Sequence, residues 1–275
     1  MGDLGIDTEV RGRDGRYTAE LTRDWEIWGP NGGYIAAIAL RAAGAHSRFD
    51  RPVTLVGHFL GVADFTTVDI EVKTLREAKR AESIHVSMTQ HGQAIFDAMV
   101  WAVGDVSGFE HDVTEMPDVP APDALPSNEE RLAAAGGRQN FKFWENFDQR
   151  SPMWIDDWEN RPTREPEFSQ WFRYLPRSTF DDPWLDACRS LILLDTIGWP
   201  AASQLHPRVG FIAPSIDLSV AFHRSMPDEP WLFAQATSPS ANGGLVACES
   251  RVWARSGELL AVGASQLLCR PAPTP

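Results

Sequence analysis

The hydrophobic pattern in the first half of the chain predicts one helix followed by an antiparallel sheet. Small apolar residues dominate positions 29–44, where Asn31 is placed to cap the first amides of a helix. Further along, Val68, Ile70 and Val72 alternate with polar residues, as in a half-buried strand. The strand-like runs of this half cover residues 17–28, 53–63, 66–77, 82–90 and 94–103.

The second half repeats this order of elements. Asp182 followed by Pro183 marks the start of a helix, which we expect to end before Gly198 and Pro200. The strand-like runs that follow it cover residues 215–225, 231–238, 245–254 and 258–268.

A fixed offset relates the two halves. Moving the first half by 165 residues superposes Gly33 on Gly198, His58 on His223 and Gly92 on Gly257. Together with the repeated order of elements, this offset indicates a tandem duplication, and we expect an α+β fold in which each half wraps a curled antiparallel sheet around one helix. Proline, alanine and acidic residues dominate between the halves, so we predict domains at 1–108 and 141–275 and a linker at 109–140.

Charge and cysteine content narrow the class of protein. The formal net charge of -13 disfavours nucleic acid as a partner, because two polyanions repel each other. Three widely separated cysteines, Cys188, Cys248 and Cys269, fit neither a disulfide framework nor a zinc site, so a reducing compartment is expected. Without a secretion signal or a run of about 20 apolar residues, we expect a soluble cytoplasmic protein with no stable membrane insertion.

Common catalytic motifs are missing from the sequence. It contains no GxGxxG, P-loop or HExxH motif, and residues 263–267 read GASQL, which lacks the final glycine of GxSxG. A serine hydrolase and a phosphate-loop enzyme are therefore not supported. The dense basic cluster of Arg76, Lys79 and Arg80 is either a solvated turn or a site for one phosphate-bearing ligand.

Asp195 is the most informative single residue. It lies near the C-terminal end of an apolar helix, where the macrodipole and the apolar neighbours both disfavour a carboxylate. Burial would raise its pKa towards the range that suits a general base. The alternative is an exposed aspartate at a frayed helix end.

Ser215 begins a strand in which polar and apolar residues alternate strictly. The alternation over 215–223 places Ser215 on the same face as Asp217, Ser219 and His223. That face is either exposed to solvent or turned towards the helix that carries Asp195, where the Ser215 hydroxyl would hold a water or a carbonyl.

Gln266 and His58 are the remaining polar candidates on strands. Gln266 alternates with Leu260, Val262 and Leu268, so we expect its amide to face the interior and to bind either a substrate oxygen, a water or a backbone carbonyl. His58 lies on a strand of the first half, where a lone histidine is more often a packing residue than a catalyst.

Four tryptophans gather in the segment after the predicted linker, at Trp144, Trp154, Trp158 and Trp171. They predict an aromatic packing layer or a flap that covers a substrate.

Several segments between Trp28 and Arg270 together carry a family resemblance. In the first half they are WGPNGGYIAAIAL, HFL at 58–60 and LREAKRAESIHVSMTQHGQAIFDAMVWA. In the second half they are DTIGWP, SIDLSVAFHR, WLFAQATS and SGELLAVGASQLLCR. In these segments the chain resembles the TesB-like acyl-CoA thioesterase II family, whose members are double hot-dog proteins. The resemblance implies that the two halves form one continuous curved sheet.

The resemblance also implies a set of site residues. Enzymes of this family use an Asp, a Thr or Ser, and a Gln to orient a water against the thioester carbonyl. By resemblance the acid is Asp195 and the hydroxyl is Ser215. The third position is Gln266 if a local bulge brings it to the site, or Ser265, on which the family's Gln falls in a gap-free alignment.

The activity implied is hydrolysis of acyl-CoA thioesters to free fatty acid and coenzyme A by direct water attack, without metal or cofactor. The acid would act as general base, the hydroxyl and amide would position the water, and a backbone N–H near a glycine turn would polarise the carbonyl. We assign Gly32, Gly33 and His58 to substrate binding, with the acyl tail in an apolar tunnel.

The sequence leaves three alternatives to hydrolysis. A non-hydrolytic acyl-CoA or acyl-carrier binding protein would share the fold but release no thiol. A hot-dog hydratase needs an Asp and His pair, and no histidine follows Asp195 before His206. A purely structural interaction protein would not need an internal aspartate. Exposed sheet edges predict a homo-oligomer, a dimer or higher. The resemblance implies the same, because family members usually assemble into at least dimers.

Overall fold

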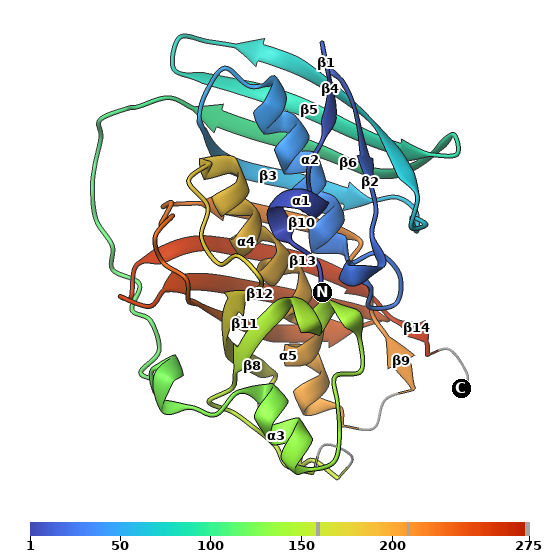
Figure 1. The fold of residues 1–275 in the computed structure, drawn as a ribbon, viewed down its shortest axis with the longest axis vertical. Coiled ribbons are helices and arrows are strands. Elements are labelled where there is room, and N and C mark those ends of the chain that lie inside the picture. Colours follow the sequence, from blue (N-terminus) through green and yellow to red (C-terminus); the bar gives the residue numbers. More distant parts are fainter. Residues whose placement is uncertain (158–159, 208–209, 273–275) are drawn as a thin grey trace.

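A computed structural model gives the fold of residues 1–157, 160–207 and 210–272 (Figure 1). The first half contains α1 (Leu4–Asp7), β1 (Arg11–Arg13), β2 (Arg16–Glu20), η1 (Arg23–Trp25), α2 (Gly32–His46), β3 (Arg51–Phe59), β4 (Thr67–Glu77), β5 (Ala81–Gln90) and β6 (Gln93–Val103). The connecting segment contains η2 (Pro122–Ala124), α3 (Asn128–Ala134) and η3 (Lys142–Asn146).

The second half repeats the arrangement of one long helix and a set of strands. Its elements are β7 (Phe147–Arg150), β8 (Glu167–Tyr174), α4 (Pro183–Thr196), α5 (Gly198–Leu205), β9 (Phe211–Ile212), β10 (Asp217–Phe222), β11 (Leu232–Asn242), β12 (Leu245–Ala254), β13 (Leu259–Leu268) and β14 (Arg270–Pro271).

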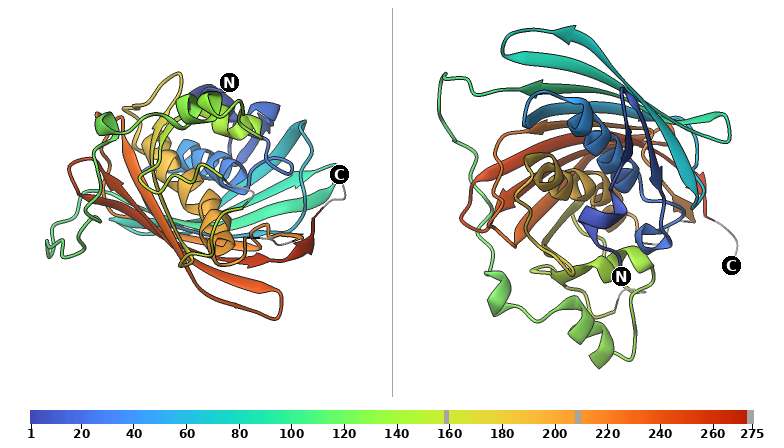
Figure 2. Two further views of the ribbon diagram at one scale, coloured as in Figure 1. Left: turned by 90° about the horizontal axis from the view of Figure 1, so that it is seen from below. Right: turned by 45° about the horizontal axis from the view of Figure 1, so that its top comes forward.

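Apart from β9 and β14, which form a separate pair, the strands of both halves join into one sheet. Within the described part of the chain, twelve strands pair antiparallel in the order β1-β2-β4-β5-β6-β3-β10-β13-β12-β11-β8-β7. The halves meet where β3 pairs with β10, with Asp217 opposite His58 and Ala221 opposite Thr54. Figure 2 shows α2 and α4 side by side over the concave face of this curved sheet. The predicted α+β fold with one continuous sheet is therefore confirmed.

The 165-residue offset holds for the strands but not for the helices. Moved by 165 residues, β4 coincides with β11, and the other three strand pairs agree within about two residues at each end. The helix that packs against α2 is α4, however, whereas the offset places α2 over α5. The superposition of Gly33 on Gly198 is therefore not a structural equivalence.

The predicted end of the first strand is wrong. The first strand ends at Glu20, not Trp28, because Thr22 accepts a hydrogen bond from the Asp24 amide and starts a short 3₁₀ turn. The predicted end of the next helix is confirmed, since α4 ends at Thr196, before Gly198, but a second helix that was not predicted, α5, begins at Gly198. Pro200 is tolerated there because the first residues of a helix need no intrahelical partner for their N–H groups.

Small residues allow α2 and α4 to approach closely. A Cβ atom on Gly33 would lie 2.7 Å from the Ile192 Cα, and one on Gly44 would lie 2.6 Å from the Trp184 ring. The two helices therefore run antiparallel, with the N-terminus of α2 beside the C-terminus of α4. At the other end of the pair, the Trp184 indole fills the space over Gly44 and donates a hydrogen bond to the Phe49 carbonyl.

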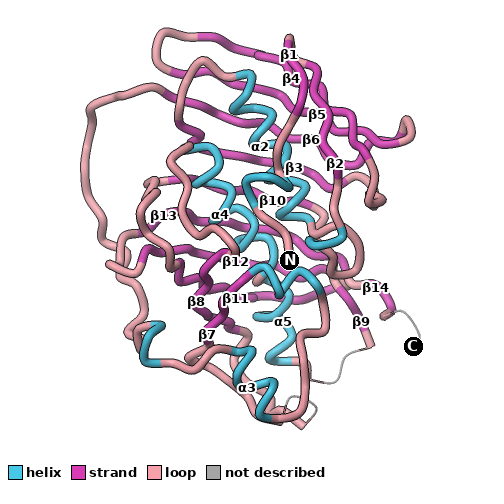
Figure 3. The backbone as a smooth tube through the Cα atoms, viewed as in Figure 1, coloured by secondary structure: helices cyan, strands magenta, loops and turns pink. Residues whose placement is uncertain are grey.

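In Figure 3 the central helices lie in front of the sheet, and the connecting segment runs along the second half, with α3 at the lower end. Within it, α3 packs against β7 and begins with a capping box formed by Ser127 and Glu130. The segment predicted as a linker thus contains a capped helix that contacts the second half.

Candidate active site

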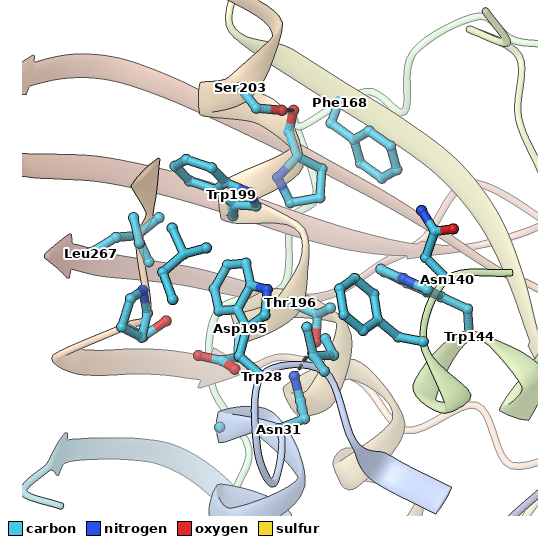
Figure 4. Close-up of a pocket in the computed structure, with 18 of the residues that line it drawn as sticks. Trp28, Asn31, Asn140, Trp144, Phe168, Asp195, Thr196, Trp199, Ser203 and Leu267 are labelled. Carbon is cyan, nitrogen blue, oxygen red and sulfur yellow. Dashed lines mark hydrogen bonds between the residues drawn. The ribbon is translucent and has the colours of Figure 1, made fainter. Parts of the chain in front are cut away.

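A cavity of about 710 Å³ opens between the helices, the sheet and the connecting segment. Its lining comes from both halves of the chain and includes Trp28, Gly32, Phe59, Trp144, Phe168, Asp195, Trp199, Ser215 and Leu267. Figure 4 shows Asp195, Thr196 and Asn31 close together on one side of this cavity, with Trp144, Asn140 and Phe168 on another. The cavity therefore combines an acidic group with a largely apolar and aromatic wall.

Asp195 is held at the meeting point of the two central helices. Its carboxyl oxygen Oδ2 accepts a hydrogen bond of 2.6 Å from the backbone N–H of Gly33, the second residue of α2. The other oxygen, Oδ1, is buried and has no hydrogen-bond partner among the described residues. One oxygen is thus fixed in place by the start of α2, and the carboxyl group also lies close to the Ser215 hydroxyl.

Burial sets the protonation behaviour of this acid. Asp195 is only 7% exposed, and the loss of solvent raises its pKa from 3.8 to about 6. The nearby Ser215 hydroxyl and the Gly33 N–H each lower the pKa, but by less than burial raises it. A carboxyl group with this pKa is ionised at neutral pH and basic enough to accept a proton from water.

A contact between the two halves makes this buried carboxylate tolerable. At the C-terminus of its own helix the acid meets the negative end of the α4 dipole, but the positive end of the α2 dipole faces it. Next to it, the Asn31 side chain accepts from the Tyr34 N–H and donates to the Thr196 hydroxyl over 3.2 Å. This compensation could not be predicted from the sequence, because it depends on a contact between distant segments.

Ser215 lines the same cavity, but not for the predicted reason. Ser219 pairs with Ala264, whereas Ser215 pairs with Leu267, so the segment between them carries one extra residue. This bulge interrupts the alternation: Ser219 is exposed, while Ser215 is partly buried beside Asp195. Strict alternation had placed the two serines on one face, and the bulge separates them.

The structure does not bring Gln266 into the cavity. Its neighbours Ser265 and Leu267 are the buried residues of this part of β13, so Gln266 points to the opposite face. Pairing with β12 is regular here, with Cys248 opposite Ser265 and Ala247 opposite Gln266, so the bulge lies on the Ser215 side of the pairing and does not turn the amide inward. Ser265 faces the helices near Gly198 but does not line the cavity either.

The three residues assigned to substrate binding have different positions. Gly32 lines the cavity, and a Cβ atom there would lie 2.8 Å from Asp195 Oδ2 and 3.0 Å from the Phe59 ring. Gly33 holds the acid through its N–H. His58 is exposed and absent from the cavity wall, because alternation along β3 turns Phe59 to the cavity instead.

Of the four tryptophans, Trp144 and Trp154 line the cavity. Trp171 is buried in a separate cluster with Phe233 and Trp253. Trp158 lies outside the described residues. The aromatic segment thus serves both packing and the cavity wall.

Sequence reasoning missed a group of buried amides. Asn128, Gln149, Gln170 and Gln204 all line the cavity and are each no more than 7% exposed. Two of them come from the segment treated as a linker and from a helix that was not predicted. Buried amides in an apolar wall are a signal of function, but the sequence alone did not show that they would share one cavity.

Family models match both halves of the chain. A model of the acyl-CoA thioesterase N-terminal domain matches residues 21–103, and a model of the acyl-CoA thioesterase C-terminal domain matches residues 114–269. The chain therefore belongs to the acyl-CoA thioesterase family and is a thioester hydrolase of the TesB-like type.

Individual relatives show how far the similarity extends. The chain is 25% identical over 252 residues to acyl-CoA thioesterase 2 of Haemophilus influenzae, covering 87% of each chain. In structure it is similar to a tesB protein of Mycobacterium avium subspecies paratuberculosis (TM-score 0.80, 24% identity, 98% of each chain). It is also similar to a hot-dog-fold protein of Alicyclobacillus acidocaldarius (TM-score 0.80, 19% identity, 98% of each chain). These likenesses identify the fold as a double hot-dog.

The described residues contain no helix that is both long and apolar enough to cross a membrane. Nor do they contain a group of three or more His, Cys, Asp or Glu side chains arranged to hold a metal ion.

Proposed function

We propose that the chain hydrolyses acyl-CoA to a free fatty acid and coenzyme A by direct attack of water, with Asp195 as the general base. The observation that carries the proposal is the state of its carboxyl group. One oxygen is anchored to the Gly33 N–H, the other is buried without a hydrogen-bond partner of good geometry among the described residues, and the group lies on the cavity wall beside the Ser215 hydroxyl. With a pKa of about 6, the group can take a proton from water at neutral pH.

In this mechanism a water lies between Asp195 Oδ1 and the Ser215 hydroxyl. The serine accepts or donates one hydrogen bond and so fixes the direction of the water's lone pair, while the acid removes its proton. The hydroxide equivalent attacks the thioester carbonyl, and coenzyme A leaves as a thiolate. The proton held by Asp195 then passes to solvent or to the thiolate, which restores the base.

The start of α2 supplies a donor for the developing oxyanion. The first N–H groups of a helix have no partner inside the helix, and the positive end of the dipole favours negative charge there. Gly33 donates to Asp195, so we assign the oxyanion to the N–H of Gly32, which lines the cavity. A side chain at Gly32 would collide with Asp195, which accounts for the glycine.

Neither candidate for the third polar position of the family reaches the cavity wall in this chain. Gln266 points away from the cavity and Ser265 does not reach its wall. We therefore propose that Asp195 and Ser215 position the water without the strand amide that the family uses.

Thiol release from acyl-CoA esters tests the proposal. Asp195→Asn keeps the size of the side chain and an oxygen for the Gly33 N–H, but cannot accept the proton, so we expect kcat to fall about 100-fold to 10,000-fold. Asp69→Asn is the matched control, because Asp69 is an exposed residue on β4, away from the cavity wall. Full turnover by the Asp195→Asn enzyme would refute the role of the base.

A further inference from the structure

The cavity contains a second polar region that the proposed hydrolysis does not use. Asn128 of α3, Gln170 of β8 and Gln149 of β7 form a chain of hydrogen bonds that we call the amide relay. Asp195 and Ser215 lie near the start of β10, and four strand spacings of about 4.8 Å separate β10 from β8 in the sheet, or roughly 19 Å along its surface. The amide relay is thus at the far side of the same cavity.

The direction of the amide relay is fixed at one end by a backbone carbonyl. The Trp144 carbonyl can only accept, so Gln149 must turn its NH₂ group towards it, at 3.0 Å. Gln149 then offers its oxygen to the Gln170 NH₂ at 2.8 Å, and Gln170 offers its oxygen to the Asn128 NH₂ at 3.0 Å. At the other end of the amide relay, the atom without a partner within the relay is therefore an oxygen, Asn128 Oδ1.

This oxygen is buried and unpartnered. Asn128 is 7% exposed and lines the cavity, and its Oδ1 has no hydrogen-bond partner among the residues that the structure describes. A buried amide oxygen without a donor is costly, so its presence in a cavity wall points to a ligand that supplies one.

Gln204 of α5 repeats the pattern independently. Its NH₂ group donates to the Pro200 carbonyl at 3.3 Å, which again can only accept. Its oxygen Oε1 is therefore the free atom, and it too is buried, without a partner in the described part of the chain, and carried by a residue of the cavity wall. Two unrelated elements thus present acceptor oxygens, and neither presents a free donor.

From this arrangement we infer that the preferred acyl group carries a hydrogen-bond donor, a hydroxyl, at a distance from the thioester. The inference rests on the proposed function, because it takes the cavity to hold the acyl group of an acyl-CoA. Asn128 Oδ1 and Gln204 Oε1 are the acceptors for the donor, and Gln170 and Gln149 are positioning residues that keep Asn128 turned the right way.

Coenzyme A itself also carries N–H and O–H donors on its pantetheine arm, so the two ends of the cavity must be told apart. Trp28 is 41% exposed and Val62 is 75% exposed on the cavity wall, and the exposed Arg270 lies on the same wall. That open end suits the anionic body of coenzyme A. A second exposed arginine, Arg138, follows α3 on the cavity wall, so the burial of the amides and not the charge of the wall distinguishes the two ends. The amide relay is buried, which suits the tail.

Paired substrates test the inference. We would measure kcat/KM for acyl-CoA esters and for their ω-hydroxy counterparts, matched carbon for carbon over a series from short to long chains. At the length that reaches the acceptors, we expect the hydroxylated ester to be preferred about 5-fold to 100-fold, the range for pairing a buried polar group that is otherwise left without a partner. A ratio of one at every length would overturn the inference.

Variants identify the atoms responsible. Asn128→Leu and Gln204→Met remove one acceptor each at similar volume, and Gln170→Met frees the Asn128 amide to turn. Each should bring the ratio towards one, whatever the change in absolute rate, and melting temperatures check that each variant folds. If the variants instead raise KM equally for hydroxylated, unsubstituted and acetyl esters, the donor belongs to pantetheine and the inference is overturned.

Failure of the proposed function would look different. If the wild-type protein released no thiol from any ester, hydrolysis would be wrong. The same paired esters, titrated by calorimetry against the Asp195→Asn protein, would still show tighter binding of the hydroxylated member if the inference about the tail is right, and equal binding if it is wrong.

Discussion

Replacing Asp195 with asparagine should stabilise the folded protein at neutral pH. Burial raises the pKa of this carboxyl from 3.8 to about 6, a shift of about two units. Each unit corresponds to about 1.4 kcal/mol, so ionising the buried acid costs the folded state roughly 3 kcal/mol relative to the unfolded chain. Asparagine does not ionise, and its side-chain oxygen can keep the bond to the Gly33 N–H.

The sign of this effect follows from the direction of the shift. Because the pKa is higher in the folded state, the folded protein holds the proton more tightly, and the contribution of Asp195 to the free energy of unfolding is greatest below pH 3.8. This contribution then falls as the pH rises through about 6, and the loss is complete above that value. The Asp195→Asn protein should lack this loss.

Urea denaturation of both proteins over a range of pH measures the effect. Other titrating groups, such as the partly buried Asp7, contribute equally to both proteins and cancel in the difference. The difference in the free energy of unfolding should grow by roughly 3 kcal/mol between the acid and the neutral end of the range, in favour of the variant. A difference that does not change with pH would refute the buried, raised-pKa state of Asp195.

Three further substitutions have definite expected outcomes. Gly33→Ala should lower the free energy of unfolding by about 1–3 kcal/mol in denaturation, because its Cβ would meet the Ile192 backbone, whereas Gly108→Ala, whose Cβ meets nothing within 4 Å, should have no effect. Ser215→Ala should lower kcat/KM about tenfold in the thiol-release assay and Ser215→Thr should restore most of it; equal rates for all three would exclude the hydroxyl from the mechanism. Gln266→Ala should leave kcat/KM within about twofold, since the side chain points away from the cavity, and a larger loss would show that the amide reaches the site.

Local sequence patterns predicted much of the fold. The strands β3 to β6 and β10 to β13 were predicted because residues that alternate between polar and apolar, as in β4, leave a period of two in the sequence, whereas β7 and β8 were not predicted. The position of α4 followed from Asp182 and Pro183, and its buried acid from the conflict between a carboxylate and apolar neighbours. These features depend on residues that are close in sequence.

The features that could not be predicted have a different cause, because each of them depends on contacts between distant segments. The α2 N-terminus that stabilises Asp195 comes from the other half of the chain. Because of a bulge before β10, Ser215 faces the cavity and Ser219 does not. No residue type in this segment predicts the bulge. The amide relay joins the predicted linker to two strands. Composition alone assigned Asn128 to the linker, because composition does not show contacts with distant strands.

The pH dependence of kcat/KM for thiol release by the wild-type protein tests the central claim most directly. If the ionised Asp195 is the general base, kcat/KM should be constant above about pH 6 and fall tenfold for each unit below it, while the residual rate of the Asp195→Asn protein should not show this step. A wild-type rate that stays constant well below pH 6, or a variant that keeps the same step, would contradict the account.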